Sequence, residues 1–245
     1  MRILISNDDG IDAPGIARLT EAARRLSGDV WVVAPEKKHT AAGPSLTLAQ
    51  PITMQQRGDK RFSCSGRPAD CVITAMAWLF KDQPKPDLVL AGINDGRNVA
   101  EDLAYSGTLG IAREASFWGL PAIGISRVKN PAIGAEDESW MAGLIGSLWS
   151  KRAEWAVEGH WLSINLPTAL PAEIRQPHIG RDKIGRNAEV IETDGDRTVL
   201  VLPRGRAHAT TPGDENSVVD GGSVSINRLN WFGQTRLGDE LVASL

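Results

Sequence analysis

The fold is decided by the first ten residues, which read Met1-Arg2-Ile3-Leu4-Ile5-Ser6-Asn7-Asp8-Asp9-Gly10. The three consecutive apolar residues in this stretch are typical of a short strand buried on both faces of a parallel sheet. Two adjacent carboxylates follow directly, and then a glycine that can take the turn. Residues 13–28 come next, with apolar side chains at helical spacing. The sequence therefore predicts that Asp8 and Asp9 lie in a strand-to-helix loop, where open α/β sheets bind their ligands.

The adjacent carboxylates of Asp8 and Asp9 predict a metal site. Two like charges about 4 Å apart repel each other by roughly 4 kcal/mol at an effective dielectric constant near 20. A bound divalent cation removes this cost and turns the loop into a receptor for anions. The alternative is that the pair only favours the start of the next helix, where a carboxylate gains about 0.3–1 kcal/mol. One aspartate would be enough for that purpose, so we prefer the metal site.

Composition and charge exclude several classes of protein. A chain of 245 residues suits one large domain, or a domain with an appendage. The net charge of −3 and the absence of a basic run argue against a nucleic acid polymer as partner. Two cysteines, Cys64 and Cys71, are too few for a disulfide framework. No signal peptide and no membrane-spanning apolar run is visible, so we expect a cytoplasmic protein without a membrane partner.

Strands and helices alternate along the first two thirds of the chain. Apolar runs predict core strands at residues 30–34, 86–91, 121–126 and 161–166. Helical spacing predicts helices at residues 68–79, 105–119 and 140–149. Alternation at residues 44–48 suits a further strand, and residues 52–54 and 61–64 flank a turn and predict a hairpin. This rhythm predicts an α/β fold with a doubly wound, mostly parallel sheet.

The pattern of the sequence changes after Pro167. Asp194-Gly195 stands between two apolar segments and predicts a second hairpin. Residues 223–227 alternate like another strand, and helical periodicity returns only at residues 238–245. This part of the chain is too polar to make a core alone.

Hairpins that cannot bury a face alone commonly pack on the main domain or on a partner subunit. We therefore divide the chain into an α/β catalytic core, residues 1–167, and a hairpin with a C-terminal tail, residues 168–245. No internal repeat or low-complexity segment is visible.

Three strand ends and one helix start converge at one edge of the predicted sheet. Asp8 and Asp9 follow the first strand, Thr40 the second and Asn94 the third. Their carboxylate, hydroxyl and carboxamide oxygens suit Mg²⁺ or Mn²⁺ and leave positions for water and a substrate phosphate. The nearby segment Ser106-Gly107-Thr108 offers backbone N–H groups and two hydroxyls to a phosphate. Either hydroxyl can instead cap the helix that begins there.

Several short motifs follow one another in order along the first two thirds of the chain. They are Asn7-Asp8-Asp9-Gly10, Val33-Ala34-Pro35, Ser45-Leu46-Thr47-Leu48, Gly66-Arg67-Pro68-Ala69-Asp70-Cys71, Gly92-Ile93-Asn94, Gly96 with Asn98, Tyr105-Ser106-Gly107-Thr108 and Ile164-Asn165-Leu166-Pro167. Together they closely resemble the stationary-phase survival protein E (SurE) family of metal-dependent 5′/3′-nucleotidases. This chain has Thr40-Ala41 where that family usually has Ser-Gly.

The resemblance implies a Rossmann-like core and a hydrolase that releases phosphate from nucleoside 5′-monophosphates, and also from 3′-monophosphates. It further implies one divalent cation per subunit, and a homodimer or homotetramer in which the hairpin and tail are exchanged between subunits. Carried over by position, the metal ligands would be Asp8, Asp9, Thr40 and Asn94. The phosphate pocket would be lined by Asn98, Ser106, Gly107 and Thr108.

The reaction that we expect is attack of a water on a phosphate held by the metal and by Ser106 and Thr108. The sequence leaves open whether Asp8 or Asp9 is the base. His39 is a candidate acid, although a lone histidine in a loop is more often a bystander.

Three rival functions compare less well with the residues. A phospho-signalling receiver needs an acceptor aspartate after the third strand, where this chain has Ala91-Gly92. A haloacid dehalogenase phosphatase needs a second aspartate where Gly10 or Ile11 stands. The remaining alternative is a catalytically weak nucleotide-binding module, in which Thr40 has weakened the metal site.

Overall fold

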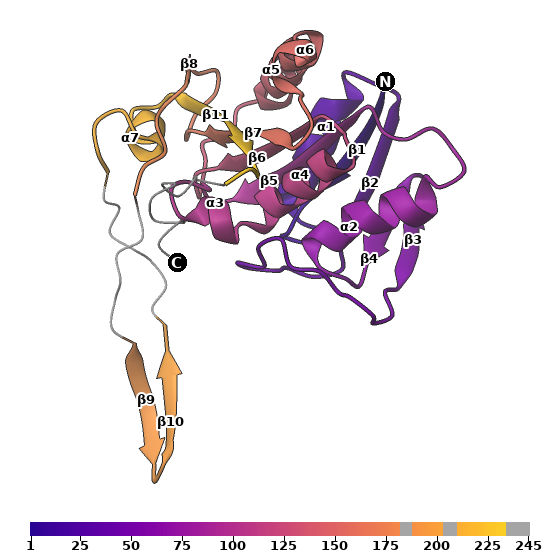
Figure 1. The fold of residues 1–245 in the computed structure, drawn as a ribbon. Coiled ribbons are helices and arrows are strands. Elements are labelled where there is room, and N and C mark those ends of the chain that lie inside the picture. Colours follow the sequence, from indigo (N-terminus) through magenta and orange to yellow (C-terminus); the bar gives the residue numbers. More distant parts are fainter. Residues whose placement is uncertain (182–187, 203–209, 234–245) are drawn as a thin grey trace, which may run out of the picture.

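A computed structural model describes residues 1–181, 188–202 and 210–233 of the chain. Its main sheet has nine strands (Figure 1). In spatial order they are β3 (Met54–Gly58), β4 (Arg61–Cys64), β2 (Asp29–Pro35), β1 (Arg2–Ser6), β5 (Leu88–Asp95), β6 (Ala122–Arg127), β7 (His160–Leu166), β11 (Val224–Asn230) and β8 (Ile174–Arg175). A separate two-stranded sheet pairs β9 (Glu189–Asp194) with β10 (Arg197–Val201).

Helices connect the strands and cover both faces of the main sheet. The helices are α1 (Pro14–Arg24), α2 (Pro68–Thr74), α3 (Asp102–Tyr105), α4 (Gly107–Phe117), α5 (Asp137–Ser150), α6 (Arg152–Trp155) and α7 (Glu215–Asp220). A π-helical segment, Ala75–Leu79, continues α2.

The centre of the sheet is parallel, as the sequence predicts. Strands β2, β1, β5, β6 and β7 pair in parallel, and β11 pairs with β7 in antiparallel. Strand β1 has β2 on one side and β5 on the other. After β1 the chain continues to β2 on one side, and after β5 it continues to β6 on the other side. The strand order therefore reverses between β1 and β5, and doubly wound sheets bind ligands at this point.

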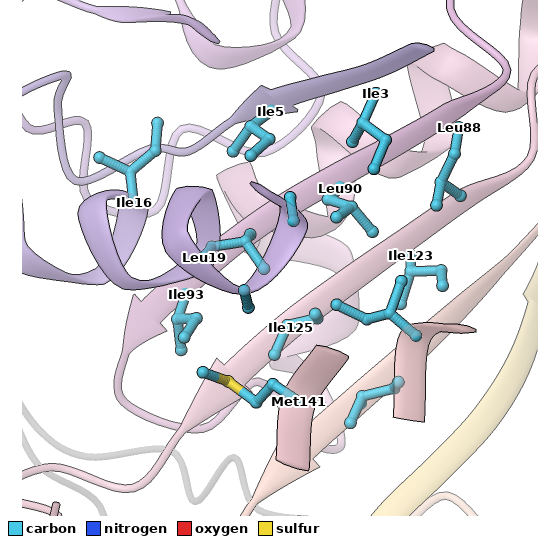
Figure 2. Packing of buried hydrophobic residues seen from close by; sticks show 14 of the residues in the cluster. Ile3, Ile5, Ile16, Leu19, Leu88, Leu90, Ile93, Ile123, Ile125 and Met141 are labelled. Atoms are coloured by element: carbon cyan, nitrogen blue, oxygen red, sulfur yellow. The ribbon is translucent and has the colours of Figure 1, made fainter. Parts of the chain in front are cut away.

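Alternate side chains of the strands form the two halves of the core. Ile3 and Ile5 of β1 pack with α1 and α5 on one face of the sheet, as Figure 2 shows in part. Leu4 packs with α2 and α4 on the other face. All three side chains are 0% exposed. The loop that follows β1 is therefore attached to a strand whose apolar side chains are fully enclosed.

The structure differs from the sequence expectations at several places, and short elements such as α3, α6 and β8 were not predicted. Residues 44–48 form no strand, because the N–H of Thr47 donates to the carboxylate of Asp70 in α2 rather than to a neighbouring strand. Strand β5 continues to Asp95 past an irregularity between Ala91 and Asn94. Helix α7 was not expected, because six residues are too few to show helical periodicity.

The C-terminal part contributes to the main sheet. Both hairpins predicted from the sequence are confirmed as β3–β4 and β9–β10. The strand expected at residues 223–227 is confirmed as β11. The helix expected at residues 238–245 lies outside the described residues, and the division of the chain at residue 167 stays a prediction. None of the described helices is long and apolar enough to cross a membrane.

Candidate metal and phosphate site

The loop after β1 is held in one conformation by side-chain and backbone hydrogen bonds. Asn7, which is fully buried, accepts from the N–H of Gly10 at 3.2 Å and donates to its carbonyl at 2.8 Å. Gly10 has φ +103°, a conformation that L side chains rarely adopt. The N–H of His39 donates to the carbonyl of Asp8 at 2.7 Å. The loops after β1 and β2 are thereby joined beside the two carboxylates.

Asp8 is held from behind by the first turn of α4. Its side chain is buried, with 7% of the residue exposed, and it accepts a hydrogen bond from Thr108 Oγ1 at 2.5 Å. A Cβ atom on Gly107 would lie 2.7 Å from the Cβ of Asp8, a distance that folded proteins essentially never show. Glycine at 107 and threonine at 108 therefore allow and fix the position of this carboxylate.

Asp9 is held from the other side. Its Oδ1 forms an ion pair with Lys38 Nζ, and its Oδ2 accepts from the N–H of Asp95 at 3.0 Å. The carboxylate side chain is almost buried, whereas Lys38 is half exposed. The loop after β2 therefore places a cation against the acidic pair.

The ionised form of Asp8 is disfavoured in the folded chain. Burial, with a smaller contribution from the negative charge of Asp9, raises its pKa from 3.8 to about 6, although the hydrogen bond from Thr108 lowers it. A nearby positive charge stabilises the carboxylate form. Most of the cost of ionising Asp8 comes from burial, and the repulsion from Asp9 that the sequence predicts is a smaller contribution.

A cavity of about 1210 Å³ opens in front of the acidic pair. The predicted site residues that line it are Asp8, Asp9, Thr40, Asn94, Asn98 and Ser106. The two others, Gly107 and Thr108, are buried behind Asp8 and are not part of the wall. The structure therefore brings the predicted residues together from four different strand ends and loops.

Hydrogen bonds orient three of these side chains. Asn94 donates from Nδ2 to the carbonyl of Gly96 at 2.8 Å, so its Oδ1 is its remaining acceptor. Asn98 donates from Nδ2 to Ser126 Oγ at 2.7 Å. Ser106 Oγ accepts from the N–H of Leu109 at 3.1 Å and is the N-cap of α4. Ser106 thus caps the helix and borders the cavity at the same time.

Asn165 supports the site but was not among the predicted residues. Its Oδ1 accepts from the N–H of Asn98 at 2.8 Å, and its Nδ2 donates to the carbonyl of Asn98 at 3.0 Å. It is 1% exposed at the end of β7. A polar residue near the end of an apolar strand was the available signal, because buried amides need hydrogen-bond partners.

Basic side chains at the cavity were also missed. Lys38, Arg97 and Lys129 line it, and together they suit an anionic ligand. Of these three residues, only Lys38 could have been predicted from the sequence, because it stands in a basic loop after a core strand. His39 does not line the cavity, and burial together with Lys37 lowers its pKa. The structure therefore offers no support for His39 as the acid.

The residues present fit a hard divalent cation. No group of three or more histidine, cysteine or acidic side chains with metal-binding geometry occurs in residues 1–181, 188–202 and 210–233. A site here would instead combine the carboxylates of Asp8 and Asp9 with neutral oxygens. The oxygens of Thr40 and Asn94 border the same cavity, and oxygen ligands are those that Mg²⁺ and Mn²⁺ prefer. Lys38 already shows that a cation is stable against Asp9.

Known proteins resemble this chain over most of its length. The family model described as Survival protein SurE matches residues 3–188. A 5′-nucleotidase SurE of Paramagnetospirillum magneticum is 37% identical over 238 residues, which cover 94% of this chain and 89% of that protein. One of Hyphomonas neptunium is 32% identical over 242 residues, covering 94% and 93%. The crystal structure of the SurE protein from Aquifex aeolicus superposes with a TM-score of 0.74 at 27% identity, covering 100% of this chain and 97% of that one.

Proposed function

Because the chain belongs to the Survival protein SurE family, we propose that it is a divalent-metal-dependent hydrolase that releases phosphate from nucleoside 5′-monophosphates. The observation that carries this proposal is the adjacent pair of Asp8, which is buried, and Asp9, whose side chain is 8% exposed, at the wall of a cavity that basic side chains also line. Relatives at 32% and 37% identity are named 5′-nucleotidases. Nucleoside 3′-monophosphates are the second substrate class that we propose.

We assign the metal to Asp8, Asp9, Thr40 and Asn94, with one Mg²⁺ or Mn²⁺ per subunit. When bound, the cation supplies charge neutralisation and polarisation of the phosphate. The donor set supports this assignment, because hard oxygen ligands from separate loops face one cavity.

The chain itself supplies binding and orientation of the phosphate. Asn98 and Ser106 border the cavity, and their backbones are fixed by Asn165 and by the start of α4. Lys38 and Arg97 add positive charge to the same wall, which stabilises a phosphoryl group as negative charge shifts to its leaving oxygen. We assign the proton of the attacking water to Asp8 or Asp9, the two residues that the sequence offers as the base. Phosphate contacts of Gly107 and Thr108 stay predictions, and their observed role is to hold Asp8.

The direct test is phosphate release from a panel of nucleoside 5′- and 3′-monophosphates. The enzyme is first treated with EDTA, and Mg²⁺ or Mn²⁺ is then added back. We expect turnover only with metal, and we expect Asp9→Asn to lower it by at least about 10³-fold, a loss typical of central catalytic groups. Asp12→Asn is the matched control, because Asp12 is exposed in the same loop and pairs with Arg61 instead.

The alternative function, a nucleotide-binding module with weak catalysis, is not favoured. This alternative supposes that threonine at position 40 has weakened the metal site. Thr40 still carries a hydroxyl and lines the cavity, so a candidate ligand is present there. Binding of nucleotide without phosphate release under every metal condition would favour this alternative and contradict the hydrolase.

We also propose that the chain is a homodimer or homotetramer in the cytoplasm. The β9–β10 hairpin lies apart from the main sheet in Figure 1 and exposes apolar side chains, among them Ile191 and Leu200. Exposed apolar surface of this kind marks contact with another chain. We expect Ile191→Asp to lower the molecular mass in sedimentation equilibrium, with Thr193→Asp as control. An unchanged mass would contradict a hairpin-mediated assembly.

A further inference from the structure

Helix α7, from the C-terminal part of the chain, is bonded to the loop that carries Asn98. Glu215 at its start is 1% exposed. Its Oε2 accepts from the N–H of Ala100 at 2.9 Å and from the N–H of Gly180 at 3.1 Å. One carboxylate oxygen thereby joins the site loop, α7 and the segment that leads to the hairpin.

A second connection lies on the other side of Asn98. The guanidinium of Arg97, which lines the cavity, donates to Asn216 Oδ1 at 2.9 Å and to Asp220 Oδ1 at 2.8 Å. Residues 97 and 100, on both sides of Asn98, are therefore bonded to the same six-residue helix.

The conformation of this loop needs external support. Ala100 has φ +52°, in the left-handed region that side chains other than glycine disfavour. Its N–H is buried and donates to Oε2 of Glu215. Losing that acceptor would leave a buried donor unpaired at a strained residue, and the loop would be expected to shift.

Helix α7 is a firm support for the loop. Asp214, fully buried, accepts from the N–H of Ser217 at 2.7 Å and caps the helix. The chain then enters β11, which pairs with β7 in the main sheet. Strand β7 also carries Asn165, which holds the backbone of Asn98 from the opposite side.

We propose that Glu215 is a positioning residue of the phosphatase site, which fixes the loop of Arg97 and Asn98 through Ala100 and makes α7 part of the catalytic unit. The proposal rests on the function proposed above. Glu215 does not line the cavity, so it acts through the loop and not on the substrate.

The acceptor, and not the charge, is what this position requires. Burial raises the pKa of Glu215, and its Oε1 has no hydrogen-bond partner in the described part of the chain. Glutamine has the same shape and keeps a carbonyl oxygen that can replace Oε2. Leucine keeps most of the buried volume but removes the acceptor.

The test compares Glu215→Leu and Glu215→Gln with Glu173→Leu, the same change at an exposed glutamate in the C-terminal part of the chain. Two readouts are used: kcat and KM for a nucleoside monophosphate with metal, and amide hydrogen exchange of residues 96–102 without substrate. In Glu215→Leu we expect kcat/KM to fall by about 10–100-fold, as for groups displaced by about 1 Å, and exchange to accelerate. Glu215→Gln stays within about threefold of the wild type because it keeps the acceptor. Glu173→Leu changes neither readout.

Wild-type kinetics and exchange in a folded Glu215→Leu variant would overturn the proposal. So would an equal loss in Glu215→Gln, because the charge would then be the requirement. If circular dichroism shows that Glu215→Leu does not fold, Asn216→Ala replaces it, because this change removes the hydrogen bond between α7 and Arg97. The same two readouts are used, and we expect a smaller fall in kcat/KM than for Glu215→Leu. If the wild type releases no phosphate from any substrate, the proposed function fails, while the exchange of residues 96–102 still decides on the positioning.

Discussion

Two strands of similar length each contain adjacent apolar residues, but those residues differ in burial. Ile3, Leu4 and Ile5 of β1 are 0% exposed, whereas Val190 and Ile191 of β9 are 62% and 64% exposed. Strand β1 has a neighbour on each side and helices over both faces, whereas β9 pairs with β10 alone among the described residues. Burial of the apolar side chains therefore follows the number of elements that surround each strand.

This difference explains where the chemistry is placed. The acidic pair follows β1, a strand with fully buried apolar side chains and a neighbour on each side, and catalytic groups need such fixed positions. The β9–β10 hairpin exposes apolar side chains, and such a surface suits contact with a second chain. The difference can be tested in both regions.

The largest effect on stability is expected in β1. Ile5→Ala removes a fully buried side chain and should lower the free energy of unfolding by about 2–5 kcal/mol. Ile191→Ala, measured in dilute and monomeric protein, should change it by less than about 0.5 kcal/mol. Urea denaturation measures both. Equal losses would contradict the contrast between the two strands.

A methyl group at Gly107 should damage the site more than the fold. Because Gly107→Ala places a Cβ against Asp8, we expect kcat/KM to fall by about 100-fold, and stability to fall by about 1–3 kcal/mol through overpacking. Gly143→Ala is the control, since nothing lies within 4 Å of its added Cβ in α5. The control should gain up to about 1 kcal/mol from helix propensity. Full activity of Gly107→Ala would show that Asp8 does not need its observed position.

A smaller effect should appear at the starts of β1 and β2 under acid conditions. Hydrogen bonds from Lys60 and Arg2 hold the pKa of Asp29 well below its ordinary value of 3.8. A lowered folded-state pKa contributes stability above pH 3.8, and this contribution is lost as the pH falls below that value. About a third of the side chain is exposed, so solvent screening limits the effect to about 1 kcal/mol. Denaturation at pH 5 and pH 3 should therefore show a smaller pH dependence for Asp29→Asn than for the wild type.

Much of the core could be predicted from the sequence. Apolar runs identified β1, β2, β5, β6 and β7, because buried parallel strands need continuous apolar residues. Their shared edge then brought Asp8, Asp9, Thr40 and Asn94 to one cavity.

Tertiary contacts decided what the sequence could not show. The alternation at residues 44–48 predicted a strand, but the backbone N–H of Thr47 instead donates to the carboxylate of Asp70. Helix α7 was too short to give a periodic signal in the sequence. The supports of the site, Asn165 and Glu215, act through hydrogen bonds to residues far away in the chain. Asn165 left only the signal of a polar residue near the end of an apolar strand, and Glu215 left none, so the folded chain was needed to reveal these bonds.

The central claim is that Asp8 and Asp9 together hold a divalent cation, and Mn²⁺ titration by calorimetry tests it most directly. We expect one Mn²⁺ per chain in the EDTA-treated wild type. We expect Asp8→Asn and Asp9→Asn each to weaken binding by at least about 10–100-fold, whereas Asp12→Asn should bind like the wild type. Unchanged Mn²⁺ affinity in the two site variants would contradict it.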